Sequence, residues 1–276
     1  MFEKFLGFVT VPMGVILNWI YENIAFHNYA LAMIIFTVVV KSALLPITIK
    51  QQKQTRKMQE LQPKLNELRK KYKNDPQKLN METMKLYQEN NLDMGGGCFT
   101  ALLQMPILLS LFYVVSKPLT YMKQFSVSEI ANLVKQFNID GKMHYKEIFI
   151  VAHTKMLNMD LFGINLASIP SLRNVYTSVF VDGNIKDLVV IMLPILAIVA
   201  TYLSSRLSMK KLDKMNKENS EKAASGATGF MLYSGVVFTA MLVFTLPAGM
   251  SLYWIVSNLY MILQQLYIDK YVIVTD

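Results

Sequence analysis

One lysine stands inside an apolar stretch of this 276-residue chain, and its position has a clear physical consequence. Lys41 lies in the segment VVVKSALLP, in a stretch that begins near Tyr29. Counted from Tyr29 as a helix, it lies about 18 Å along the axis, well inside the hydrocarbon if the stretch crosses a bilayer. Inserting a cation at such a depth costs roughly 2.5–3.5 kcal/mol. Lys41 is therefore the first candidate for a functional group.

A buried acid would offset that cost, but none of the five apolar stretches defined below contains Asp or Glu. Lys41 then snorkels to the membrane surface, loses its proton, or faces a water-filled recess. We take the last interpretation as the hypothesis, with a hydrated groove lined by polar groups from all the stretches. Each of these groups could equally make an ordinary interhelical hydrogen bond. The candidates are Thr37, Gln104, Thr201, Ser204, Ser234, Asn258 and Gln264.

Composition excludes several other kinds of chemistry. Hydrophobic residues make up 53% of the chain and charged residues 17%, against about 25% charged in a typical soluble domain. The single cysteine, Cys98, rules out an intrachain disulfide, a thiolate zinc site and a CxxC redox pair. The chain has neither a GxxxxGK[ST] phosphate loop nor an HExxH motif. We therefore expect no catalytic residues, no metal site, no cofactor and no enzyme activity.

The apolar stretches predict an all-α polytopic membrane protein. The last tract is too long for one crossing, and the sequence Leu246-Pro247-Ala248-Gly249 near its middle divides it. The core of the protein then covers residues 29–268, with five spans at about 29–48, 98–115, 188–205, 229–245 and 248–268. Residues 1–28 are expected to form an interfacial helix on the outer surface. A sixth span over residues 5–21 is the alternative.

Loop charges predict the orientation of these spans. Eleven Lys or Arg residues lie between residues 50 and 95, and six lie in the short loop before residue 229. The longer loop over residues 118–186 carries seven. The positive-inside rule places the two dense loops in the cytoplasm. The N-terminus is then outside, the 118–186 loop is extracytoplasmic, and the tail at 269–276 is cytoplasmic.

The first basic loop, residues 50–95, is predicted to form a helical hairpin. An apolar stripe runs along it, and Lys73-Asn74-Asp75-Pro76 indicates a turn followed by a new helix. Exposed basic residues of this hairpin are candidates for contact with ribosomal RNA or anionic lipid. A plain spacer is the alternative. The stripe is Met58, Leu61, Leu65, Leu68 and Tyr72, and the basic residues are Arg69, Lys70 and Lys71.

Four segments, in order, carry a resemblance to the YidC/Oxa membrane-protein insertase family in its short bacterial form. They are YALAM through KSALLPITIKQQ (29–52), GCFTALLQMPI (97–107), LPILA (193–197) and LPAGMSLYWIVSNL (246–259). Two positions depart from the family pattern. Lys41 stands where the family usually has Arg, and Lys lacks the planar bidentate fork. Ser204 lies near a position where the family often has Gln.

The resemblance implies a five-helix core around a groove that opens to the cytoplasm and to lipid, and it adds Trp254 to the candidate groove. We therefore expect a membrane-protein insertase in the bacterial plasma membrane. It would move hydrophilic segments of its substrates through the groove and release their apolar segments into lipid, without nucleotide hydrolysis. The expected substrates are nascent membrane proteins, and the expected partners are the ribosome and the Sec translocon, with no specific nucleic acid sequence. A small-solute channel or transporter, or a non-translocating assembly scaffold, remains as an alternative.

Overall fold

The computed structural model describes residues 2–92, 96–139, 145–170, 186–218 and 224–272, and most of them are helical. The all-α class expected from the sequence is thereby confirmed. The β-structure in these ranges consists of a short antiparallel hairpin and an isolated parallel bridge between Asn28 and Asn158. The elements are α1 Phe2–Asn23, α2 Tyr29–Ala43, α3 Leu45–Glu60, α4 Gln62–Lys71, α5 Pro76–Glu89, α6 Gly96–Ser116, α7 Pro118–Tyr121, α8 Val127–Gln136, α9 Lys146–Thr154, β1 Asp160–Leu161, β2 Ile164–Asn165, α11 Lys186–Glu218, α12 Ala224–Val243 and α13 Ala248–Tyr267, followed by a π-helical turn, Ile268–Val272.

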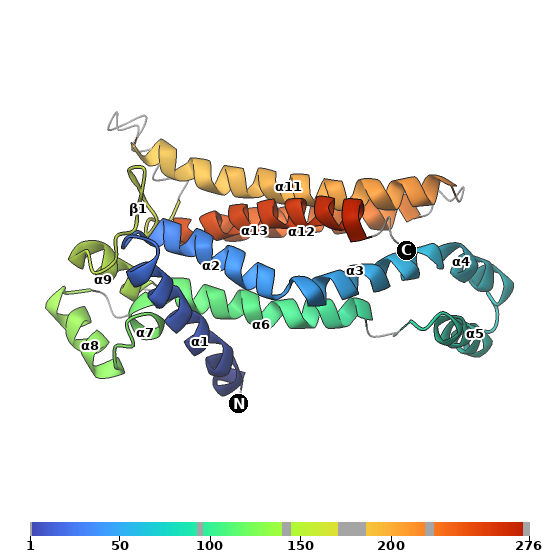
Figure 1. Cartoon of the computed structure of the whole chain (residues 1–276), viewed down its shortest axis with the longest axis horizontal. Helices are drawn as coiled ribbons and strands as arrows, with labels where there is room; N and C mark the ends of the chain where they lie inside the picture. The colour runs from blue at the N-terminus through green and yellow to red at the C-terminus, as the bar shows by residue number, and fades with distance from the viewer. Residues whose placement is uncertain (1, 93–95, 140–144, 171–185, 219–223, 273–276) are drawn as a thin grey trace.

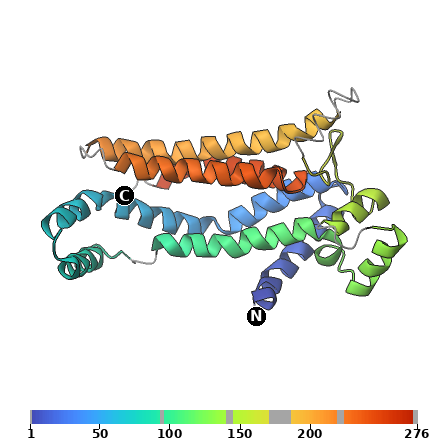
Figure 2. The same ribbon diagram turned by 180° about the vertical axis from the view of Figure 1, so that it is seen from behind.

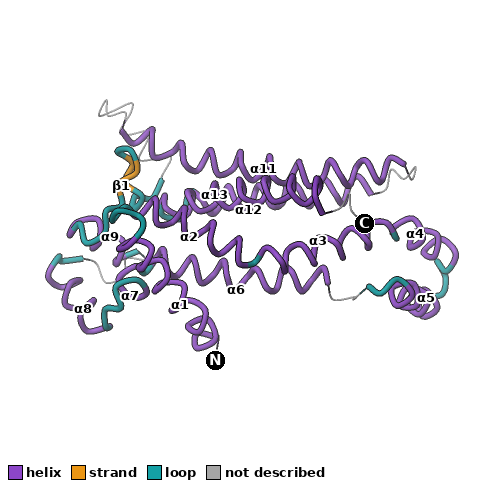
Figure 3. The backbone as a smooth tube through the Cα atoms, viewed as in Figure 1, coloured by secondary structure: helices purple, strands orange, loops and turns teal. Residues whose placement is uncertain are grey.

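The long helices lie along the longest axis of the molecule (Figure 1). They are α2, α3, α6, α11, α12 and α13, and the view from behind shows the same arrangement (Figure 2). The hairpin helices α4 and α5 lie at one end. At the opposite end α7, α8, α9 and the β1–β2 hairpin form a group that we call the end cap, residues 118–170 (Figure 3). Helix α1 runs obliquely away from the end cap.

Prolines set two of the breaks between helices. A proline lacks the backbone N–H and its ring clashes with the carbonyl four residues earlier. Accordingly, α2 ends at Ala43, and α3, which contains Pro46, is inclined to α2 by 56°. Pro247 is the residue before α13, and it separates α13 from α12 as the sequence predicts. Pro106 and Pro194, in contrast, lie inside the single helices α6 and α11.

A third proline produces a break that the sequence analysis missed. Pro63 lies in the first turn of α4, and its ring excludes a helical hydrogen bond to the turn before it. Helix α3 therefore ends at Glu60, and the stripe expected from Met58 to Tyr72 is divided between α3 and α4. Leu61 and Leu65 of the stripe are buried, while Met84 of α5 is exposed.

Length and apolar composition show fewer membrane-crossing helices than the five predicted. Within the described ranges, Val189–Ser208 is long and apolar enough to cross a membrane, and the bent pair Tyr29–Ala43 with Leu45–Thr55 is a second if it counts as one span. Pro106–Ser116 and Tyr233–Val243 are apolar but shorter. They belong to α6 and α12, and the N-terminal parts of these two helices contain residues whose side-chain surroundings the structure does not describe. The number of spans therefore stays a prediction.

Helix α1 is attached to the bundle through its C-terminal half. Leu17, Ile20 and Tyr21 are buried in the core, whereas Phe8 near the start is largely exposed. Lys123 of the end cap pairs with Glu22, and this hydrogen bond, helped by the charges of Lys123 and His27, holds the pKa of Glu22 below its ordinary value. The last turn of α1 and the end cap therefore hold each other in place.

One glycine of α1 permits a close approach of backbones. A Cβ at Gly14 would lie 2.7 Å from the carbonyl carbon of Tyr121 and would also overlap its oxygen. Backbone atoms cannot yield as a flexible side chain can, so α1 and α7 would have to separate. Gly7, about two turns earlier in α1, has nothing within 4 Å of the equivalent position.

We therefore predict opposite effects for the same substitution at these two sites. Gly7→Ala should stabilise the protein by up to about 1 kcal/mol, because alanine favours the helix. Gly14→Ala should destabilise it by about 1–3 kcal/mol, because overlap with Tyr121 outweighs that gain. Thermal unfolding of both variants in detergent, followed by circular dichroism, measures the difference. Equal stabilisation by both would show that α1 does not lie against Tyr121.

Candidate functional site

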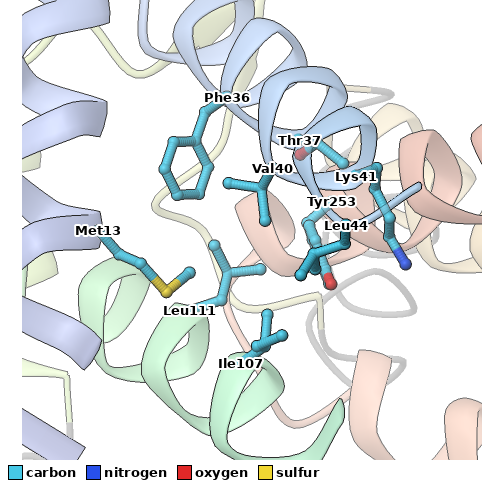
Figure 4. Close-up of a pocket in the computed structure, with 9 residues that line it drawn as sticks. All are labelled: Met13, Phe36, Thr37, Val40, Lys41, Leu44, Ile107, Leu111 and Tyr253. Carbon is cyan, nitrogen blue, oxygen red and sulfur yellow. The ribbon is translucent and has the colours of Figure 1, made fainter. Parts of the chain in front are cut away.

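Lys41 lies in the last turn of α2 and borders a narrow pocket in the bundle (Figure 4). In the close-up its amino group lies on the side of Leu44 and Tyr253, away from Met13 and Phe36. The pocket walls come from α1, α2, α6 and α13. The lining residues are Met13, Phe36, Thr37, Val40, Lys41, Leu44, Ile107, Leu111 and Tyr253.

This pocket has little room and few polar groups. Its volume is about 10 Å³, close to the minimum that holds one water molecule. Thr37 is buried and its hydroxyl donates to the Met33 carbonyl at 2.7 Å, so its proton is already used within α2. In this conformation the pocket is an apolar recess beside an amino group. A wide hydrated groove requires helices around it to move apart.

Lys41 itself is half-buried and has no counter-charge nearby. Within the described ranges it makes no ion pair or hydrogen bond to another residue. The surrounding side chains are mainly aliphatic or aromatic. The physical alternatives for Lys41 therefore remain those stated from the sequence, and the role of the residue stays a hypothesis.

Three other predicted groove residues form a separate polar cluster between α11 and α13. Ser204 donates to Oδ1 of Asn258 at 2.5 Å, and the Asn258 amide nitrogen donates to Oγ1 of Thr201 at 3.2 Å. Ser204 and Asn258 are buried. The amide of Asn258 also donates to the Trp254 carbonyl at 2.8 Å. The bonds from Ser204 and to Thr201 are interhelical hydrogen bonds, the alternative that the sequence left open for each residue, whereas the bond to Trp254 lies within α13.

The remaining predicted residues are dispersed. Gln264 is buried, and its amide nitrogen has no hydrogen-bond partner among the described atoms. Trp254 is half-buried and packs edge-to-face against Tyr253 with ring centroids 6.3 Å apart. Ser234 is exposed on α12, and the side chain of Gln104 lies outside the description. Of the predicted residues whose side chains the structure describes, the Lys41 pocket contains Lys41 and Thr37.

Seven of the nine pocket residues were missed by reasoning from the sequence, and Met13 and Tyr253 show why. Met13 belongs to α1, which was expected to lie apart on the membrane surface, and yet it closes one side of the pocket. Tyr253 precedes Trp254 in the motif LPAGMSLYWIVSNL, and that position was the available signal. An aromatic residue in an apolar helix gives no indication of the partner that it faces.

At the far end of the molecule, the three basic candidates lie together in the last turn of α4. Arg69, Lys70 and Lys71 are exposed there, where the helix dipole favours positive charge. Lys71 and Lys78 both approach the ring of Tyr72, at 5.4 and 5.5 Å from its centroid. The aromatic ring between α4 and α5 thus draws two cations to the turn. Contact with RNA or lipid stays a prediction.

Comparison with known proteins gives one consistent result. The model of the 60Kd inner membrane protein family matches residues 19–275. A membrane protein insertase YidC of Caldanaerobacter subterraneus subsp. tengcongensis is 31% identical over 257 residues, which cover 93% of this chain and 92% of that protein. The membrane protein insertase YidC 2 of Listeria innocua is 27% identical over 95% of this chain and 71% of its own length. A YidC of Clostridium perfringens is 48% identical over 87 residues, 32% of this chain and 37% of that protein.

The polar cluster between α11 and α13 gives a testable ranking of two substitutions. Asn258 and Gln265 each accept a hydrogen bond from a serine of α11, Asn258 at 2.5 Å and Gln265 from Ser208 at 3.2 Å. Asn258 is the more buried of the two. Asn258→Leu should cost about 1–2 kcal/mol, because it removes partners of Ser204 and Thr201. Gln265→Leu should cost less than half as much. Chemical unfolding in detergent gives both values, and a larger effect at Gln265 would contradict the ranking.

Proposed function

We propose that this chain, which belongs to the 60Kd inner membrane protein family of YidC and Oxa insertases, inserts nascent membrane proteins into the bacterial plasma membrane. The match covers most of the chain, and the full-length relatives are named insertases rather than enzymes. Among the described residues there is also no cluster of His, Cys, Asp and Glu that could hold a metal ion. Physical partition of the substrate into lipid, without nucleotide hydrolysis, drives the proposed reaction.

The observation that carries the proposal is the position of Lys41. A half-buried amino group in an apolar bundle, with no acid within ion-pair distance in the described part, is costly to maintain. It attracts an acidic segment of an incoming chain, and such a segment supplies the missing counter-charge. The same segment brings water with it, which lowers the cost of moving other polar groups into the bilayer.

The groove of the proposal is an opened form of the Lys41 pocket. The pocket is bordered by four separate helices, α1, α2, α6 and α13, so its width depends on their spacing. The 56° bend between α2 and α3 places the cytoplasmic continuation of α2 at an angle to the bundle. Release of the apolar part of the substrate then occurs between helices, into lipid. The narrow, apolar form of the pocket gives no support to the alternative of a small-solute channel.

The arrangement of the two ends supports the proposed topology of five spans, with the N-terminus outside and the C-terminus inside. The basic hairpin α4–α5 and the end cap lie at opposite ends of the long helices (Figure 1). A membrane around those helices would separate the two. The hairpin would then meet the ribosome, the Sec translocon or anionic headgroups in the cytoplasm. Helix α1 would start from the outer interface at its C-terminal end and enter the membrane obliquely, since its Met13 borders the Lys41 pocket.

Substitution of Lys41 tests the proposed capture of acidic segments. An attraction of about 1 kcal/mol changes a rate about fivefold, so Lys41→Ala should slow insertion of a substrate with an acidic translocated segment by about that factor. Lys41→Glu should slow it more, and Lys41→Arg should retain activity. The assay is insertion by purified protein in vesicles without nucleotide, scored by protease protection of the substrate.

Two controls separate capture from general damage. Lys50→Ala removes an exposed cation from α3, beyond the bend, and should leave insertion unchanged. A substrate with a neutral translocated segment should be less sensitive to Lys41→Ala. Normal insertion of acidic substrates by Lys41→Ala would exclude electrostatic capture. Leakage of small solutes through the same vesicles would favour the channel alternative.

Accessibility of introduced cysteines tests the topology. In a Cys98→Ser background, a cysteine at Lys64 of α4 should resist a membrane-impermeant thiol reagent in intact cells. A cysteine at Lys135 of α8 should react, because the end cap is on the outside. Both positions are exposed, so burial does not explain a difference. Permeabilised cells should label both, and labelling of Lys64 in intact cells would reverse the orientation.

A further inference from the structure

The end cap contains a second, much larger pocket at the base of the β1–β2 hairpin. Its volume is about 380 Å³, within the range of small-molecule sites, and it is partly open. The polar side chains that line it are Lys155, Asn158, Asp160 and Asn165. All four belong to the end cap, and none takes part in the Lys41 site.

The hydrogen bonds of the two asparagines leave donors rather than acceptors at this pocket. Oδ1 of Asn158 accepts from the Asp160 N–H at 3.2 Å, and Oδ1 of Asn165 accepts from the Ala167 N–H at 2.9 Å. Within the described ranges, neither amide nitrogen makes a hydrogen bond. Together with the ammonium group of Lys155 they provide three groups that can donate to an anionic oxygen.

The pocket also contains a carboxylate, so a simple anion does not match it. Oδ2 of Asp160 accepts from the Gly163 N–H at 3.1 Å, and its other oxygen remains available. Lys155 and Asp160 do not pair with each other in the described structure. One cation and one carboxylate that line the same pocket without pairing match a ligand that carries both charges, such as a phosphodiester joined to a primary ammonium.

Backbone contacts place this pocket at the start of two long helices. The Tyr29 N–H, in the first turn of α2, donates to the Asn158 carbonyl at 2.9 Å, and Asn28 Nδ2 donates to the Asp160 carbonyl at 3.2 Å. The Gly249 N–H, at the start of α13, donates to the Leu166 carbonyl at 2.9 Å. On the topology proposed above, these helix starts lie at the outer edge of the hydrocarbon, so the pocket lies at headgroup depth.

Exposed aromatic residues beside the pocket indicate the same depth. Phe162, in the two-residue turn of the hairpin, is 96% exposed, and Phe26, just before α2, is 88% exposed. An exposed Phe side chain is costly in water, and Phe is among the residues that interfacial segments insert into the membrane surface. The hairpin has only two residues in each strand, which keeps Phe162 within about 10 Å of the helix starts.

We propose that this pocket binds the headgroup of an outer-leaflet phospholipid with a primary amine, the phosphatidylethanolamine class. The phosphate oxygens accept from Lys155, Asn158 and Asn165, the ammonium donates to Asp160, and Phe162 enters the interface beside the acyl chains. The end cap is thereby fixed to the membrane surface. The depth of the site rests on the proposed topology, but binding itself does not require insertase activity.

Native mass spectrometry of the full chain in detergent tests the site. With phosphatidylethanolamine, phosphatidylcholine and phosphatidylglycerol added in equal amounts, the chain should retain phosphatidylethanolamine preferentially. Lys155→Gln should weaken that retention about five- to tenfold, as expected for loss of one charge-assisted hydrogen bond. Lys135→Gln removes an exposed lysine of α8 outside the pocket and is the matched control. Circular dichroism should show both variants folded.

The outcomes distinguish a membrane phospholipid from a soluble phosphodiester as the ligand of this pocket. Soluble glycerophosphoethanolamine at the lipid concentration should not displace the bound lipid, because it lacks the acyl chains beside Phe162. Displacement at that concentration would show a site for a free phosphodiester and would overturn the lipid assignment. Equal retention of the three lipids, or equal loss in Lys135→Gln and Lys155→Gln, would also overturn it. A chain that fails the vesicle insertion assay but retains the lipid would refute the proposed function alone.

Discussion

A protonated amino group inside an apolar bundle must reach water or a counter-charge, and the arrangement around Lys41 depends on that requirement. The sequence provides no acid in any predicted span, and the structure brings none to Lys41 among the described residues. The helices around it leave space for about one water molecule. If the Lys41 charge has no partner in the resting form, binding of an acidic ligand lowers the free energy of the protein, because the ligand supplies the missing counter-charge. This is the physical basis of the proposed capture of a substrate, for which the substrate's own partition into lipid would be the energy source.

Hydrogen bonding determines which helices stay together when the pocket widens. Helices α11 and α13 are joined by the Thr201–Ser204–Asn258 cluster and by the bond between Ser208 and Gln265. Between α2 and α13, one side-chain bond joins Ser42 and Tyr260 at 3.0 Å, near the cytoplasmic end of the predicted span. Apolar helix contacts cost little to separate in lipid, because lipid tails are as apolar as the side chains that they replace. The pair α11–α13 is therefore the rigid part of the bundle.

Reasoning from the sequence predicted the features that depend on local chemistry and missed those that depend on distant partners. The helical class, the helix beginning at Pro76 and the break at Pro247 follow from composition and proline, which act within a few residues. Pro63 acts in the same way and could have been recognised. The contact between Met13 and the Lys41 pocket could not, because periodicity shows which face of α1 is apolar but not what that face meets. Asn258 was identified as polar and intramembrane, but only the structure pairs it with Ser204 across 54 positions.

Helix α1 connects the Lys41 pocket with the end cap, since it closes one side of the pocket and is held by the end cap. Its firm attachments are at its C-terminal half, where Glu22 pairs with Lys123 and the Asn158 N–H donates to the Tyr21 hydroxyl at 3.0 Å. Met13 lies further toward the N-terminus, beside Gly14, whose backbone lies against Tyr121 of α7. This contact depends on close packing, because a Cβ at Gly14 would overlap the Tyr121 backbone. The part of α1 that closes the Lys41 pocket is therefore positioned by the end cap at both Glu22 and Tyr121, and fixing the end cap to the membrane surface, as proposed, would fix this wall of the pocket with it.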